Sequence, residues 1–111
     1  MKIKVDRDSV CMGDDVNSHV KTVVIDDGAS CGDLVKMLQG CGFFANVSGN
    51  DVVWVLTAGG KYVLAYYTKT ERVLQLISET RLSGICGMGK LNFKYYTSPK
   101  KWEQIQRSRR N

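Results

Sequence analysis

The chain opens with two stretches whose polar and apolar positions follow the pattern of β-strands. Residues 2 to 5 alternate charged and apolar side chains, and residues 20 to 25 form a run rich in β-branched side chains. Most of positions 13–18 are glycine, aspartate, asparagine or serine, which are typical of turns. This pattern predicts an opening β-hairpin.

The next stretch has the spacing of a short helix. Ser30 can cap its start, and Asp33 at the third helical position is favourable near the positive end of the helix dipole. The apolar face of this helix consists of Leu34, Val35 and Leu38. Gly40 and Gly42 end it after about ten residues, so it must dock on a sheet to be stable.

From Phe43 onward the pattern predicts mainly strands, at residues 43–47, 52–57, 61–68, 73–77 and 91–97. The stretch 52–57 is apolar almost throughout, as in a central strand covered on both faces. Gly59 and Gly60 predict a tight turn after it. The glycine-rich residues 82–89 predict a loop.

A final helix is predicted to begin at Ser98, which can cap it, and Pro99, which suits the first helical position. Trp102 and Ile105 lie three residues apart on one face and predict that this helix docks on the domain. The strand before it directs one set of side chains to the core, namely Leu91, Phe93 and Tyr95.

Together these elements predict one α+β domain over residues 1–106, with a mixed or antiparallel sheet, a short C-terminal helix and a basic frayed tail at residues 107–111. A length of 111 residues suits one domain with one core. Over residues 1–77 the order of hairpin, helix and further strands resembles the β-grasp architecture of ubiquitin-like domains, in which a helix packs across a mixed sheet. A resemblance of topology implies a fold and no function.

Membrane insertion and secretion are not expected. The longest apolar run, residues 52–56, is far shorter than the roughly 20 residues of a spanning helix. The first residues alternate like a strand and lack the apolar block of a secretory signal. The cysteines are therefore expected to be free thiols in a cytoplasmic protein, at Cys11, Cys31, Cys41 and Cys86.

Residues Gly84 to Lys90 match the spacing G-x-x-x-x-G-K of a phosphate-binding loop. Leu91 stands where such a loop needs a serine or threonine to ligate magnesium, and a strand pattern follows where a helix N-terminus is required. We interpret the match as coincidental and expect neither a nucleotide cofactor nor nucleotide hydrolysis.

No other pattern indicates catalysis or metal binding. His19 is the single histidine, and no cysteines have C-x-x-C spacing. The adjacent aspartates at 14–15 and 26–27 fit solvated turns. Cys31, at a predicted helix start, and Cys86, between glycines, are the candidates for a reactive thiol. We expect no catalytic residue, cofactor or metal, and keep thiol-dependent redox or enzyme activity at these two cysteines as a second alternative.

The positive charge of the chain is concentrated at its C-terminal end. Residues 1–89 have nine Lys and Arg against ten Asp and Glu, whereas residues 90–111 have seven against one. Basic and aromatic side chains alternate there, as in surfaces that bind nucleic acid or acidic proteins. The candidate contact residues are Lys90, Lys94, Tyr96, Lys100, Lys101, Arg107, Arg109 and Arg110.

Three readings of this segment stay open: docking on an acidic protein surface, contact with nucleic acid, and solubility alone. The leading hypothesis is a small interaction module without catalytic activity, which binds another protein through its sheet or its basic C-terminal helix. The alternative is a nucleic-acid-binding protein that uses residues 90–110.

Overall fold

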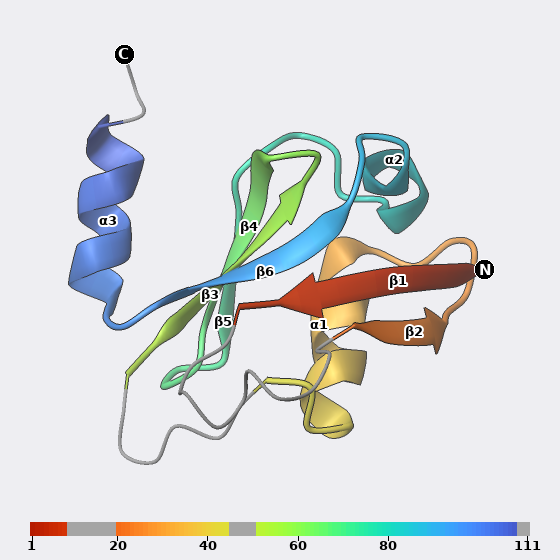
Figure 1. Cartoon of the computed structure of the whole chain (residues 1–111), viewed down its shortest axis with the longest axis horizontal. Helices are drawn as coiled ribbons and strands as arrows, with labels where there is room; N and C mark the ends of the chain where they lie inside the picture. The colour runs from red at the N-terminus through yellow and green to blue at the C-terminus, as the bar shows by residue number, and fades with distance from the viewer. Residues whose placement is uncertain (9–19, 45–50, 109–111) are drawn as a thin grey trace.

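The computed structural model describes residues 1–8, 20–44 and 51–108, which form one α+β domain with a six-stranded mixed sheet and three helices (Figure 1). The strands are β1 (Lys2–Arg7), β2 (Lys21–Val24), β3 (Val53–Ala58), β4 (Lys61–Tyr67), β5 (Arg72–Gln75) and β6 (Leu91–Tyr96). The helices are α1 (Cys31–Gly40), α2 (Leu82–Cys86) and α3 (Pro99–Ser108). The predicted α+β class is confirmed.

The last strand in the sequence lies inside the sheet, whose strand order is β2-β1-β6-β3-β4-β5. β1 and β2 form the predicted antiparallel hairpin, with Ile3 opposite Val23. β1 and β6 run parallel, with Val5 beside Leu91, and the other neighbouring strands run antiparallel. Residues 91–96 therefore complete the main sheet, between β1 and β3.

α1 begins at the position that the sequence predicts. The Ser30 hydroxyl oxygen accepts a hydrogen bond from the Asp33 amide at 3.1 Å, and the Asp33 carboxylate accepts one from the Ser30 amide at 2.9 Å. Hydrogen bonding from Ser30, first through its amide, lowers the pKa of Asp33 because it stabilises the ionised carboxylate. The predicted apolar face is buried, at Leu34, Val35 and Leu38.

Each face of the sheet has its own core. β3 is buried at every residue, with Trp54 and Leu56 in the core that contains α1 and α2, and Val53 and Val55 in the core that contains α3. Figure 1 shows these helices on opposite sides of β3, β4 and β5. Because helices cover both faces here, this strand is apolar except at Thr57, as predicted.

Two local predictions are wrong. The predicted loop at residues 82–89 contains α2, because Leu82 and Ile85, three residues apart, are both fully buried and a helical turn directs both into the core. Phe43 and Phe44 belong to no strand, although residues 43–47 were expected to form one; their rings pack edge to face with centroids 5.5 Å apart. Residues 45–47 lie outside the described residues.

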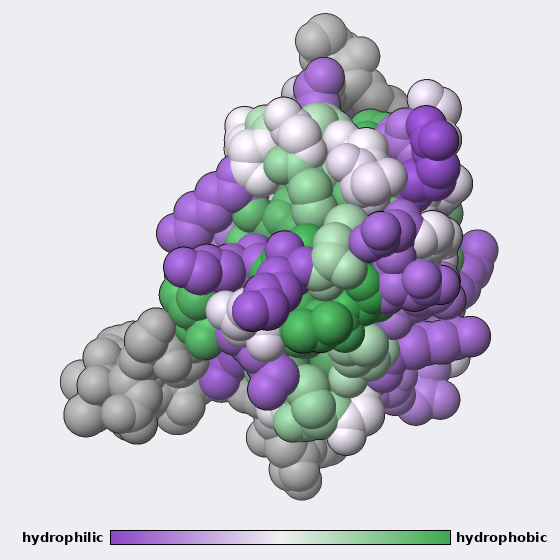
Figure 2. All heavy atoms as spheres, turned by 90° about the vertical axis from the view of Figure 1, so that its right-hand side faces the viewer, coloured by the Kyte–Doolittle hydropathy of each residue, from purple (hydrophilic) through white to green (hydrophobic). Residues whose placement is uncertain are grey.

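The surface differs between the two ends of the molecule. Figure 2 shows the end with the N-terminus and α2, where a strip of hydrophobic residues lies between hydrophilic ones. α3 lies at the other end and is the most basic helix, with Lys100, Lys101 and Arg107. Within residues 1–8, 20–44 and 51–108, the helices are all too short and polar to cross a membrane.

Candidate binding surface around the C-terminal helix

α3 begins as the sequence predicts. Pro99 is its first residue, and the Ser98 hydroxyl oxygen accepts a hydrogen bond from the Lys101 amide at 3.3 Å. The Trp102 amide donates to the Ser98 carbonyl, also at 3.3 Å. The helix continues through Arg107 to Ser108, and residues 109–111 lie outside the described residues.

Trp102 attaches α3 to the sheet. Its side chain is fully buried, in a core with Val53, Val55 and Ala65. Its ring lies 5.3 Å from that of Tyr62 in an edge-to-face arrangement, and 5.2 Å from that of Tyr96. The hydroxyl groups of the two tyrosines lie 3.1 Å apart. Burial of a tryptophan among aromatic rings fixes a short helix firmly, so the charges of α3 have a defined place on the domain.

The second apolar residue of α3 has a different role from the one predicted. Ile105 was expected to pin the helix beside Trp102, but it is 39% exposed. It lines a hollow of about 370 Å³ between α3 and the end of β6, together with Tyr96, Lys101, Gln104 and Ser108. Ile105 is therefore an apolar contact point on the surface and contributes little to the core.

The acidic and basic side chains of α3 lie on different sides of the helix. Lys101 lies on the flank with the Ile105 hollow, whereas Glu103, the one acidic residue in the helix, lines a different hollow on the opposite flank. Lys100 and Arg107 are exposed and, seven residues apart, share the outward face. The Ile105 flank and the outward face are therefore cationic.

Lys94 adds a cation from the sheet beside α3. It is exposed, two residues before Tyr96 and on the same face of β6. Its ammonium nitrogen lies 6.0 Å from the centre of the Tyr62 ring, at the limit of a cation–π contact. We define the cationic α3 surface by its four cations and two apolar side chains: Lys94, Tyr96, Lys100, Lys101, Ile105 and Arg107.

Not all of the candidate contact residues lie on this surface. Lys90 precedes β6 at the end of the strand away from α3, roughly 20 Å from Tyr96 at strand spacing. Its ammonium group lies 3.6 Å from the Asp6 carboxylate. Arg109 and Arg110 lie outside the described residues. The structure thus brings five of the eight together and separates Lys90 from them.

Tyr62 belongs to the site but was not among the candidates from the sequence. It lies 34 residues before Tyr96, at the start of β4, and only the β3–β4–β6 pairing brings the two rings to Trp102. The alternation in β4 predicts that Tyr62 lies on one face of the sheet. No local signal says which helix covers that face.

The aromatic rings of the site are already engaged within the protein. Tyr62 has the Trp102 ring on one side and the Lys94 ammonium group over its ring, and Tyr96 is half-buried against Trp102. A base that stacked on either ring would have to displace these contacts. These contacts make either ring a poor stacking platform for nucleic acid.

The two candidate thiols lie in surroundings that disfavour the reactive thiolate. Cys31 is fully buried at the start of α1, and this burial raises the pKa of its thiol to about 11. Partial burial also raises the pKa of Cys86. Desolvation thus outweighs the effect of the helix dipole on which the expectation for Cys31 was based.

Residues 84–90, whose spacing matches a phosphate-binding loop, form the end of α2 and the connection from α2 to β6. The final lysine, Lys90, leads directly into β6. Gly89 has a φ of +134° and lies against the backbone of Gly59. These glycines thus have a packing role.

Within residues 1–8, 20–44 and 51–108, histidine, cysteine and acidic side chains form no group of three or more that could hold a metal ion. His19 and Cys11 lie outside these residues. No protein-family model, no curated protein and no solved structure matches the chain.

Proposed function

We propose that this protein is a small interaction module without catalytic activity, and that it binds an acidic surface of another protein through the cationic α3 surface. The observation that carries the proposal is the exposed Ile105, which lines a hollow together with Lys101 and Tyr96. Lys94 lies two residues before Tyr96 and adds a further cation. An apolar contact point inside a charged rim is typical of protein interfaces.

We further propose that the domain is β-grasp-like. Three features support this: the opening β1–β2 hairpin, the helix α1 on one face of the sheet, and the parallel pairing of β6 with β1 in the middle of the sheet. On this interpretation β5 and α3 are additions, and α3 carries the binding surface. The free thiols Cys31, Cys41 and Cys86 are in keeping with a cytoplasmic location, which we also propose.

Affinity capture from the native host with charge-reversed variants tests the proposed binding. One variant reverses three cations of the surface, Lys94→Glu, Lys101→Glu and Arg107→Glu. The matched control makes the same change in net charge at exposed lysines elsewhere, Lys21→Glu, Lys36→Glu and Lys69→Glu. We expect the wild type and the control to retain one stoichiometric acidic protein, and the first variant to lose it.

Nuclease treatment during the capture separates the proposal from nucleic-acid binding. A partner that is retained after nuclease digestion supports a protein–protein contact. Recovery of DNA or RNA by the wild type, lost in the first variant and strongly weakened by salt, would favour the nucleic-acid alternative instead.

A further inference from the structure

β5 forms one edge of the sheet, and its outward backbone groups have no backbone partner among the described residues. The Leu76 amide donates to the Val63 carbonyl of β4 at 2.8 Å. Because the direction of hydrogen bonding alternates along an antiparallel strand, the N–H and C=O groups of Val73 and Gln75 point away from β4. Within the described residues no backbone hydrogen bond reaches these outward groups.

This edge has few of the features that usually block strand pairing. β5 has neither lysine nor proline, its register with β4 is regular, and only its first residue, Arg72, is charged. The Val73 side chain is 37% exposed on the α1 side of the sheet. A free edge of this kind is a template for an extended peptide segment.

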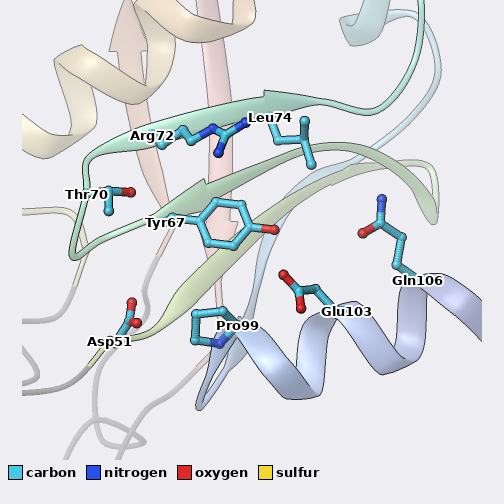
Figure 3. Close-up of a pocket in the computed structure, with 8 residues that line it drawn as sticks. All are labelled: Asp51, Tyr67, Thr70, Arg72, Leu74, Pro99, Glu103 and Gln106. Carbon is cyan, nitrogen blue, oxygen red and sulfur yellow. The ribbon is translucent and has the colours of Figure 1, made fainter.

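A hollow of about 430 Å³ adjoins this edge, between β5 and α3 (Figure 3). Its apolar lining comes from Leu74, the Tyr67 ring and Pro99, and its acidic lining from Glu103 and Asp51. Figure 3 shows the Tyr67 hydroxyl and the Glu103 carboxylate facing the same space. Neither carboxylate has an ion-pair partner within the described residues.

The charged side chains that line this hollow are more negative than positive. Burial, and then the charge of Glu103, raise the pKa of the Tyr67 hydroxyl. Smaller effects of Trp102 and of the Arg72 charge lower that pKa. Arg72 also lines the hollow, from the strand itself, so two carboxylates oppose one guanidinium.

We propose that β5 binds an extended peptide segment as a seventh strand, and that the hollow takes a lysine or arginine side chain of that segment. In this arrangement the peptide pairs with the outward groups of Val73 and Gln75. The basic side chain lies beside Leu74, with its methylene groups on Leu74 and Tyr67 and its charge facing Glu103. The Ile105 hollow is on the other flank of α3, so this second site does not depend on the cationic α3 surface.

NMR titration of the full-length, isotope-labelled protein with short blocked peptides tests this proposal. The probe is Thr-Val-Lys-Val-Thr-Val. Its comparison peptides are one with glutamate in place of lysine, and one N-methylated at every backbone amide, so that neither of its edges has an N–H group with which to pair with a strand. We expect the lysine peptide to slow hydrogen exchange at the Val73 and Gln75 amides, and to bind about 3-fold more tightly than the glutamate peptide.

Two variants test the acidic lining of the hollow. Glu103→Gln is expected to remove the preference for lysine while keeping the protection of the Val73 and Gln75 amides. The control Asp26→Asn, at an exposed position in the turn before α1, is expected to keep both.

Three outcomes would overturn the proposal. The first is a lack of protection with every peptide, and the second is equal binding of the N-methylated peptide. The third is protection at Val73 and Gln75 that rises with protein concentration alone, which would assign the edge to a second copy of the chain.

Discussion

The backbones of Gly59 and Gly89 cross each other and are in direct contact. Gly59 lies in the turn between β3 and β4 with a φ of +57°, and its amide donates to the Lys90 carbonyl at 3.0 Å. A Cβ atom added to Gly89 would lie 2.7 Å from the Gly59 Cα, and one added to Gly59 would overlap the Met88 carbonyl. The crossing holds the β3–β4 turn against the segment that enters β6.

Gly89→Ala is therefore expected to destabilise the protein by about 2–4 kcal/mol, from backbone strain at a φ of +134° and from the clash with Gly59. Chemical denaturation monitored by circular dichroism measures this change. The matched control is Gly40→Ala at the end of α1, where an added Cβ has open space, with an expected change within about 1 kcal/mol. An equal effect of both substitutions would contradict the packing role of the crossing.

Trp102→Ala is expected to detach α3 from the sheet and to lower the free energy of unfolding by about 3–5 kcal/mol, because a fully buried ring is lost. Hydrogen exchange should then become fast along α3 and stay slow in α1. Trp102→Phe is expected to cost less and to keep α3 protected. If α3 stayed protected in Trp102→Ala, Trp102 would not be the anchor of the helix.

The thiols provide a test of the reactive-cysteine alternative. With a pKa of about 11, Cys31 has a thiolate fraction at neutral pH that is lower than that of an ordinary thiol by roughly 100-fold. Among the three cysteines that the structure describes, iodoacetamide labelling followed by mass spectrometry should modify the exposed Cys41 first, then Cys86, and Cys31 only on unfolding. Faster labelling of Cys31 than of Cys41 in the folded protein would revive the alternative.

The capping box of α1 predicts a dependence of stability on pH. The folded protein has a lowered pKa at Asp33, so the stabilisation from its carboxylate is complete above the unfolded value of about 3.9 and is lost as pH falls through the folded value. Asp33→Asn is expected to be less stable than the wild type at neutral pH. The difference should shrink below about pH 4. A difference that does not vary with pH would contradict this account of the cap.

The sequence predicts the local elements more reliably than their neighbours in space. The start of α1 at Ser30 and of α3 at Pro99 follows from side chains within one turn of the helix. The alternation of residues 91–96 likewise predicts β6 and its core face. That β6 runs parallel to β1 depends on a contact between residues more than 80 positions apart, which leaves no local pattern.

The candidate site shows the same division. The composition of the sequence shows that basic residues are concentrated near the C-terminus, and the sequence also indicates that Trp102 docks the helix. The sequence does not reveal that Ile105 stays exposed. A helix with two apolar residues on one face can bury either one or both of them against a sheet. In the structure Trp102 is the buried one, against the Tyr62 and Tyr96 rings.

Photo-crosslinking from position 105 in the native host tests the central claim most directly. Ile105 is replaced by the photoreactive residue p-benzoylphenylalanine in the wild-type background and in the two triple variants. A second wild-type probe with the same replacement at Lys36, on the exposed side of α1, reports non-specific contact.

We predict one discrete adduct with an acidic protein from position 105. This adduct should resist nuclease and be absent with the probe at position 36. It should disappear when the charges of Lys94, Lys101 and Arg107 are reversed. It should persist when the charges of Lys21, Lys36 and Lys69 are reversed. No adduct from position 105, an adduct that nuclease removes, or one that survives reversal of the three surface cations would contradict the proposed function.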